Sequence, residues 1–190
     1  MEKPILFSTE MVRAILDGRK TQTRRVVKPS VLEKGTNWFW NPNENICLAQ
    51  YRKGDVLWVR ETFCEVPYEY NHIPIKGGHI TTPKYAYKAD SERDYTGIWK
   101  PSIHMPKEAA RIWLEVTDVR VERLQEITGQ DVLKEGLNSH VHPQAFYFDC
   151  NQREMFENLW NSTIKKSDLD RYGWDSNPWV WVIEFERIAA

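Results

Sequence analysis

Residues 18–25, which read Gly-Arg-Lys-Thr-Gln-Thr-Arg-Arg, place four cations and two threonines directly after a helix-like segment. In that segment a serine or threonine can cap a helix, and apolar residues recur at helical spacing over residues 11–16. Gly18 is suited to end the helix, because glycine readily adopts the left-handed conformation found after helix C-termini. Beyond it, the threonines and the Val26-Val27 pair favour extended structure. The stretch is therefore predicted to leave a helix and enter a strand.

Four other segments have the apolar patterns of strands. Residues 4–7 and 56–59 are short apolar runs, and residues 179–187 alternate between apolar and polar side chains. In residues 112–121 the apolar side chains change from even to odd positions near residues 117–118. This change of phase predicts a bulge or bend within one long strand.

Two further helices complete the expected architecture. Thr128 and Asp131 form a capping-box pattern that opens a helix, and Gly136 is suited to end it. Residues 151–164 carry apolar side chains at helical spacing. The strands are too short and too closely connected for a doubly wound parallel sheet. We therefore expect an α+β fold, with a small curved β-barrel and peripheral helices.

A long insertion lies between the predicted strands. Residues 62–110 contain five prolines, a Gly77-Gly78 pair and many tyrosines, and only residues 85–88 resemble a strand. Its aromatic content argues against a disordered linker. A loop of this length in a compact domain usually has a binding role or contains structure that the pattern does not reveal.

The chain has 190 residues, of which 41% are hydrophobic, with 26 basic side chains against 27 acidic ones. These values predict a single domain over residues 1–190, and the balanced charge excludes a polycation that coats nucleic acid. No stretch reaches the roughly 20 apolar residues that span a membrane, so we expect a cytoplasmic protein without a membrane partner. Cys47, Cys64 and Cys150 lie far apart, which predicts free thiols, no metal site and no cofactor.

Basic residues are concentrated near the N-terminus. Residues 1–30 contain seven basic and three acidic side chains, and Asp17 is the only acid within the densest part. Such a cluster suits contact with the phosphates of RNA, and the alternative is a solvated helix end. The basic cluster consists of Arg13, Arg19, Lys20, Arg24, Arg25 and Lys28.

Several motifs, taken in order, resemble the ASCH domain family. They are residues 18–25, residues 54–59 (Gly-Asp-Val-Leu-Trp-Val), residues 124–128 (Leu-Gln-Glu-Ile-Thr) and residues 135–137 (Glu-Gly-Leu). Residues 99–106 further resemble a longer subgroup that is common in bacteriophages and prophages. The resemblance implies a PUA-like β-barrel with a cleft for RNA or a modified nucleobase.

Some small members of this family are amidohydrolases that remove an acyl group from the exocyclic amine of cytidine. The positions that match their lysine, threonine and glutamate are Lys20, Thr23 and Glu135. In this interpretation Thr23 is the nucleophile, a neutral Lys20 is its base, and Glu135 is a proton shuttle or a partner of the cytosine edge. Lys20 and Thr23 would point to opposite faces of a regular strand, so the triad requires a turn or bulge. Burial and neighbouring arginines are expected to lower the pKa of Lys20.

Other residues are candidates for binding substrate or RNA, the two expected partners. Two tryptophans in a polar segment are suited to stacking on bases. These binding candidates are Arg19, Thr21, Arg24, Arg25, Arg60, Trp38 and Trp40. The alternative to the catalytic interpretation is that Thr21 and Thr23 are ordinary strand threonines. Lys20 is then a solvated charge and Glu135 a carboxylate at a helix end. Three functions stay open: an amidohydrolase of acylated cytidine or a related base, a non-catalytic RNA-binding module, and a ribonuclease of the same fold.

Overall fold

The main sheet has five strands in the order β1-β3-β8-β9-β2. The computed structural model describes residues 1–27, 50–66, 72–75, 78–81, 84–90, 98–137 and 148–189. Strands β1 and β3 are parallel, and the other neighbours in this sheet are antiparallel. The strands are β1 (Glu2–Leu6), β2 (Gln22–Val26), β3 (Val56–Arg60), β8 (Trp113–Arg123) and β9 (Trp179–Ile188).

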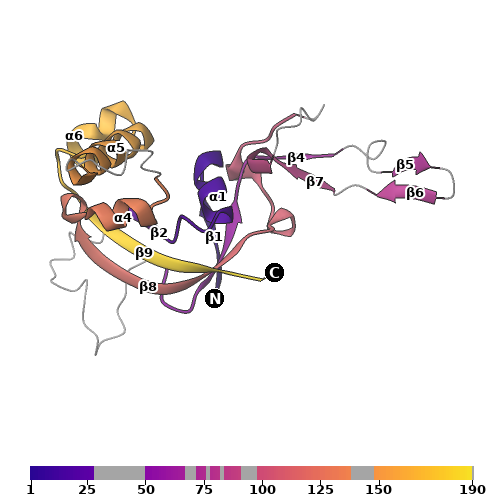
Figure 1. Ribbon diagram of the computed structural model, residues 1–190, viewed down its shortest axis with the longest axis horizontal. Helices are drawn as coiled ribbons and strands as arrows, with labels where there is room; N and C mark the ends of the chain where they lie inside the picture. The colour runs from indigo at the N-terminus through magenta and orange to yellow at the C-terminus, as the bar shows by residue number, and fades with distance from the viewer. Residues whose placement is uncertain are drawn as a thin grey trace.

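Strands β8 and β9 form a long curved ribbon that runs past α4 to the C-terminus (Figure 1). Their register shifts between Val116 and Asp118, where the change of apolar phase predicts an irregularity. An extra residue in one strand increases the local bend, so the two strands can curve together. The predicted bulge or bend is therefore confirmed.

The helices begin and end close to the predicted residues. Helix α1 (Thr9–Leu16) is capped by Ser8, whose hydroxyl accepts from the Met11 amide, and Gly18 follows it with a φ of +73°. Thr128 and Asp131 form the predicted capping box of α4. No helix of the described residues has the length and hydropathy to cross a membrane. The other α-helices are α4 (Gly129–Lys134), α5 (Phe148–Thr163) and α6 (Leu169–Tyr172).

The insertion contains more regular structure than its sequence indicates. Besides the predicted strand near residues 85–88, it holds three further short strands, and the pairs β4–β7 and β5–β6 extend away from the main sheet as an arm (Figure 1). Their lengths of three or four residues are too short for a periodic signal. The strands are β4 (Phe63–Glu65), β5 (His72–Ile75), β6 (Gly78–Thr81) and β7 (Tyr85–Tyr87). Short 3-10 helices occupy Lys88–Asp90, Ser102–His104, Lys107–Ala109, Leu124–Glu126 and Lys166–Asp168.

Strand β9 is buried on both faces and contributes to two hydrophobic cores. Trp181, Ile183 and Phe185 belong to the core that includes α1, whereas Val180 and Val182 belong to the core that includes α5. A sheet covered by helices in this way, with one parallel and several antiparallel pairs, is the α+β class that the sequence predicts. The edge strand β2 pairs with β9 and consequently lies beside both cores.

Candidate functional site

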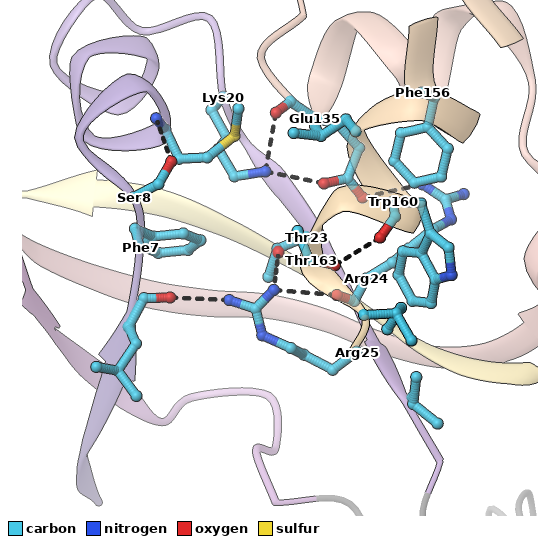
Figure 2. A pocket seen from close by; sticks show the side chains of 15 residues that line it. Phe7, Ser8, Lys20, Thr23, Arg24, Arg25, Glu135, Phe156, Trp160 and Thr163 are labelled. Atoms are coloured by element: carbon cyan, nitrogen blue, oxygen red, sulfur yellow. Dashed lines mark hydrogen bonds and ion pairs between the residues drawn. The ribbon is translucent and has the colours of Figure 1, made fainter. Parts of the chain in front are cut away.

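A cavity of about 410 Å³ lies at edge strand β2, between the start of α1 and helix α5. Its volume falls within the roughly 300–1,000 Å³ that is usual for small-molecule sites. Lys20, Thr23 and Glu135 all line it, although they come from the turn before β2, from β2 itself and from the end of α4 (Figure 2). The fold therefore brings the three residues that the family resemblance singled out to one place.

The backbone around Lys20 provides the turn that this arrangement requires. Strand β2 begins only at Gln22, and the Lys20 amide donates to the Ala14 carbonyl, 3.0 Å away, at the end of α1. Lys20 and Glu135 also form an isolated antiparallel bridge. Because Lys20 precedes the regular strand, its side chain does not follow the alternation of β2 and can face the same cavity as Thr23.

Lys20 and Glu135 form a buried ion pair, with only 3% and 5% of the residues exposed. Lys20 Nζ donates to Glu135 Oε2 at 2.8 Å, to the Glu135 carbonyl at 2.9 Å and to the Gln22 carbonyl at 2.8 Å. Burial lowers the pKa of Lys20, and the charges of Arg25 and Arg24 act in the same direction, whereas Glu135 opposes them. The direction agrees with the sequence prediction. A lysine with a lowered pKa can lose its proton closer to neutral pH.

Arg24 lines the cavity and is paired with carboxylates through both terminal nitrogens of its guanidinium. Its guanidinium is buried, donates to Glu135 Oε1 at 3.1 Å and to Glu122, and lies 3.5 Å from Asp131. It also faces the ring of Phe156, with 5.9 Å between the guanidinium carbon and the ring centroid. Both oxygens of Glu135 are thus held, one by Arg24 and the other by Lys20. Arg24 is therefore placed to orient Glu135, not to contact a phosphate.

Arg25 lies on the other face of β2 and borders Thr23. Its Nη1 donates to Thr23 Oγ1 at 3.1 Å, and its Nη2 donates to the Leu6 carbonyl at 3.0 Å. Its guanidinium also lies 5.4 Å from the centroid of the Phe7 ring. Among the described residues, no carboxylate is within ion-pair distance of Arg25. This arginine is therefore the cation of the cavity that is best able to stabilise a negative charge on a ligand.

Most of the basic cluster makes bonds within the protein. Arg13 donates to the Ala89 carbonyl, and Arg19 donates to Asp17 and to the Gly136 carbonyl. Together with the pairs of Lys20 and Arg24, these bonds leave no continuous row of unpaired cations in the described part of the cluster. Lys28 lies outside the described residues.

The other predicted binding residues do not line the cavity. Arg19 and the exposed Thr21 lie outside it, and Arg60 donates to the Ile103 carbonyl and lies against the Trp58 ring. Trp38 and Trp40 lie outside the described residues. Within the described ranges no group of three His, Cys, Asp or Glu side chains could hold a metal ion.

Helix α5 supplies lining residues that the sequence did not assign to a site. The cavity is lined on one side by four residues of α5 and by the residue directly after it: Phe156, Leu159, Trp160, Thr163 and Ile164. Their helical spacing indicates only an apolar helix face, and such a face usually packs into a core. Phe156 and Trp160 pack into a hydrophobic core and also line the cavity. The sequence pattern of α5 therefore does not distinguish a core residue from a cavity-lining residue.

Gly136 fixes the distance between α4 and the turn that carries Lys20. It has a φ of +91°, and a Cβ at this position would lie 2.7 Å from Ala14 Cβ and 2.9 Å from Lys20 Cβ. Gly136→Ala is expected to destabilise the protein by roughly 2–3 kcal/mol in urea denaturation, through strain and overpacking. Gly54→Ala is the matched control, because Gly54 has a φ of +82° but no atoms within 4 Å of the added Cβ. Equal losses for the two variants would contradict the close approach.

Comparisons with known proteins find similarity only to solved structures, at low sequence identity. No protein-family model matches the chain, and no curated protein matches it. A crystal structure of the hypothetical protein PH0355 has 14% sequence identity and a TM-score of 0.41, and the match covers 99% of this chain and 100% of that chain. An ASCH domain from Lactobacillus crispatus JV V101 has 11% identity and a TM-score of 0.39, over 98% of this chain and 79% of that chain. Because these similarities are low, the site must be interpreted from its own residues.

Proposed function

We propose that the cavity binds a cytidine with an acylated exocyclic amine, or a closely related nucleoside, and that the protein hydrolyses the amide bond. One observation supports this most: Thr23 lines the same cavity as a buried Lys20 that is hydrogen-bonded to Glu135. These three side chains are the nucleophile, base and proton-transfer group that amide hydrolysis requires.

In the first step, Thr23 Oγ1 attacks the acyl carbon while its proton passes to the neutral amine of Lys20. Arg25, which already donates to Thr23 Oγ1, can donate to the oxyanion that forms on the same carbon. The bond between the acyl carbon and the exocyclic nitrogen then breaks. The leaving nitrogen takes its proton from the Lys20 ammonium, directly or through Glu135, and the nucleoside leaves with a free amine.

In the second step, water hydrolyses the acyl ester on Thr23. Lys20, neutral again, takes a proton from the water as its oxygen bonds to the acyl carbon. The ester bond breaks as the Lys20 ammonium returns this proton to Thr23 Oγ1, and the acyl group leaves as a carboxylic acid. Glu135 is held by Lys20 and Arg24 throughout, so it is fixed in the position from which it can exchange a proton with Lys20.

A monomeric nucleoside fits the cavity better than an RNA strand does. A protein that binds the RNA backbone needs several cations that neutralise phosphates. In the described part of the basic cluster, Lys20 and Arg24 are paired with carboxylates and Arg19 with Asp17. Arg13 donates to backbone carbonyls and does not line the cavity, so Arg25 is the main cation of the cavity left for a ligand. This argues for recognition of one base.

A non-catalytic nucleoside-binding or RNA-binding module is the second candidate. Lys20 Nζ makes three hydrogen bonds, to Glu135 Oε2, the Glu135 carbonyl and the Gln22 carbonyl, which is the full donor capacity of an ammonium group. The Glu135 carboxylate opposes the lowering of the Lys20 pKa by burial, and a lysine whose donors are all used within the protein is suited to a structural role. The two candidates therefore differ in whether Lys20 titrates during turnover.

Incubation with N4-acetylcytidine tests the proposal. We expect the protein to release cytidine and acetate in equal amounts, and chromatography measures both products. Binding of N4-acetylcytidine without release would instead support the non-catalytic module. Cleavage of a single-stranded RNA probe without cytidine release would support a ribonuclease.

The pH dependence of turnover tests the role of Lys20. Because burial lowers the Lys20 pKa from its ordinary value of 10.5, the neutral base form becomes populated below that pH. The rate of hydrolysis is expected to rise with pH through a single ionisation below 10.5 and then level off. Lys20→Arg is expected to lower kcat at least a hundredfold, since arginine keeps the charge but does not deprotonate.

Two measurements keep this test independent of folding. Circular dichroism and the affinity for cytidine should remain close to those of the parent protein in Lys20→Arg. A rate that does not change with pH, or near-parental turnover by Lys20→Arg, would show that the lysine acts only as a cation.

A further inference from the structure

One side of the cavity is formed by a face of α5, here called the apolar wall. It consists of four residues of α5 together with the residue that directly follows the helix: Phe156, Leu159, Trp160, Thr163 and Ile164. Phe156 and Trp160 are nearly fully buried, whereas Leu159 and Ile164 are only partly buried. The partly buried aliphatic side chains are consequently able to contact a ligand.

The polar groups of the apolar wall are already used within the protein. Thr163 Oγ1 donates to the Trp160 carbonyl at 2.7 Å, and Trp160 Nε1 donates to the Tyr172 carbonyl at 2.8 Å. The Phe156 ring faces the Arg24 guanidinium (Figure 2), so this face is not free to stack on a base. The wall therefore offers a ligand mainly apolar contact.

The remaining polar side chains of the cavity lie around Thr23. Arg25 provides charged donors there and the Glu135 carboxylate provides acceptors, whereas the three donors of Lys20 Nζ are used within the protein. The ring nitrogen and carbonyl of cytosine need such partners, because a buried polar group without a hydrogen bond is costly. A saturated acyl chain needs none. The base is therefore better accommodated beside the polar side chains than against α5.

Building on the proposed function, we infer that the acyl group of the substrate lies against the apolar wall and that the protein prefers acyl chains longer than acetyl. The acyl carbon must touch Thr23 Oγ1, and the chain attached to it then extends away from the polar side chains. Leu159 and Ile164 are the residues with which an added methylene would make contact. The substrate class is thus nucleosides whose exocyclic amine carries an apolar acyl group.

The expected preference follows from the transfer of methylenes out of water. Each methylene that becomes fully buried is expected to raise kcat/KM about fourfold. Butanoyl has two more methylenes than acetyl, so N4-butanoylcytidine should exceed N4-acetylcytidine by about fifteenfold. Hydrolysis leaves the same nucleoside in both cases, so the comparison isolates the acyl group.

The test measures kcat/KM for N4-acetyl-, N4-butanoyl- and N4-hexanoylcytidine with the full chain. A rise from acetyl to butanoyl supports the inference. Equal or falling values, with acetylcytidine hydrolysed, would overturn the inference and leave the proposed function intact. Hydrolysis of none of the three would instead overturn the proposed function.

A variant of the wall tests which residues carry the preference. Leu159→Ala is expected to reduce the butanoyl-to-acetyl ratio of kcat/KM by at least fourfold, because it removes the aliphatic contact. Asn158→Ala is the matched control on the same helix, since Asn158 is exposed and does not line the cavity. An unchanged ratio in Leu159→Ala would place the acyl group elsewhere and overturn the inference.

Discussion

Replacement of Arg24 by methionine is expected to lower the free energy of unfolding by about 3–5 kcal/mol, the usual cost of removing one partner from a buried ion pair. The side chain of Arg24 is entirely buried and pairs with Glu122, Asp131 and Glu135. Without its charge, the three carboxylates would lose the buried cation that they share, and among the described residues each would keep only Lys20 or the partly exposed Arg120 as a cationic partner. Methionine has a similar length, so little of the loss should come from a cavity.

The pH dependence of this loss identifies its electrostatic origin. Burial raises the pKa of Asp131, but hydrogen bonds from Thr128 and the charge of Arg24 outweigh burial and hold this pKa below its ordinary value. A carboxyl with a lowered pKa stabilises the fold above its unfolded pKa, and this contribution is lost as the pH falls through the folded pKa. The difference in the free energy of unfolding between Arg24→Met and the parent protein should therefore become smaller as the pH falls from 7 to 3.

Urea denaturation at both pH values is the measurement. Arg187→Met is the matched control, because Arg187 is exposed and its side chain makes only a long bond of 3.4 Å within the described residues, to the Leu16 carbonyl. Arg187→Met is expected to lower the free energy of unfolding by less than about 1 kcal/mol. Arg24→Lys, which keeps the charge but not the planar fork, should fall between the two. A loss for Arg24→Met that equals the control would mean that Arg24 does not hold the carboxylates together.

Local signals predict the frame around the candidate site well. Gly18 ends α1, the Thr128 capping box opens α4, and Gly136 ends it, so the two ends that carry Lys20 and Glu135 follow from short-range chemistry. The register shift after Val116 is likewise visible as a change of apolar phase. Each of these features depends on residues within a few positions of one another.

The partners of charged residues are not predictable in the same way. Arg24 pairs with Glu122, Asp131 and Glu135, which follow it by 98 or more positions, and no local pattern connects them. The sequence consequently predicts a basic surface at the basic cluster, although most of the described residues of this cluster form hydrogen bonds or ion pairs within the protein. The role of α5 is hidden for a similar reason, because Leu159 belongs to an apolar helix face whether or not a cavity lies beside it.

Thr23 should be the residue whose replacement has the largest effect on turnover. Thr23→Val keeps the branched shape in the strand and removes only the hydroxyl that attacks the acyl carbon. Since loss of a nucleophile that acts together with its base removes most of the catalysis, we expect kcat to fall by at least about 10³-fold. Thr21→Val is the matched control, because Thr21 is exposed, precedes the strand and makes backbone bonds that the replacement leaves in place.

The most direct measurement is the release of cytidine from N4-acetylcytidine by the parent protein, Thr23→Val and Thr21→Val under the same conditions. We predict turnover by the parent protein and by Thr21→Val, and a loss of at least about 10³-fold in Thr23→Val with binding of cytidine retained. Turnover by Thr23→Val at the rate of the other two proteins, or no turnover by any of them, would contradict the assignment of Thr23 as the nucleophile of an amidohydrolase.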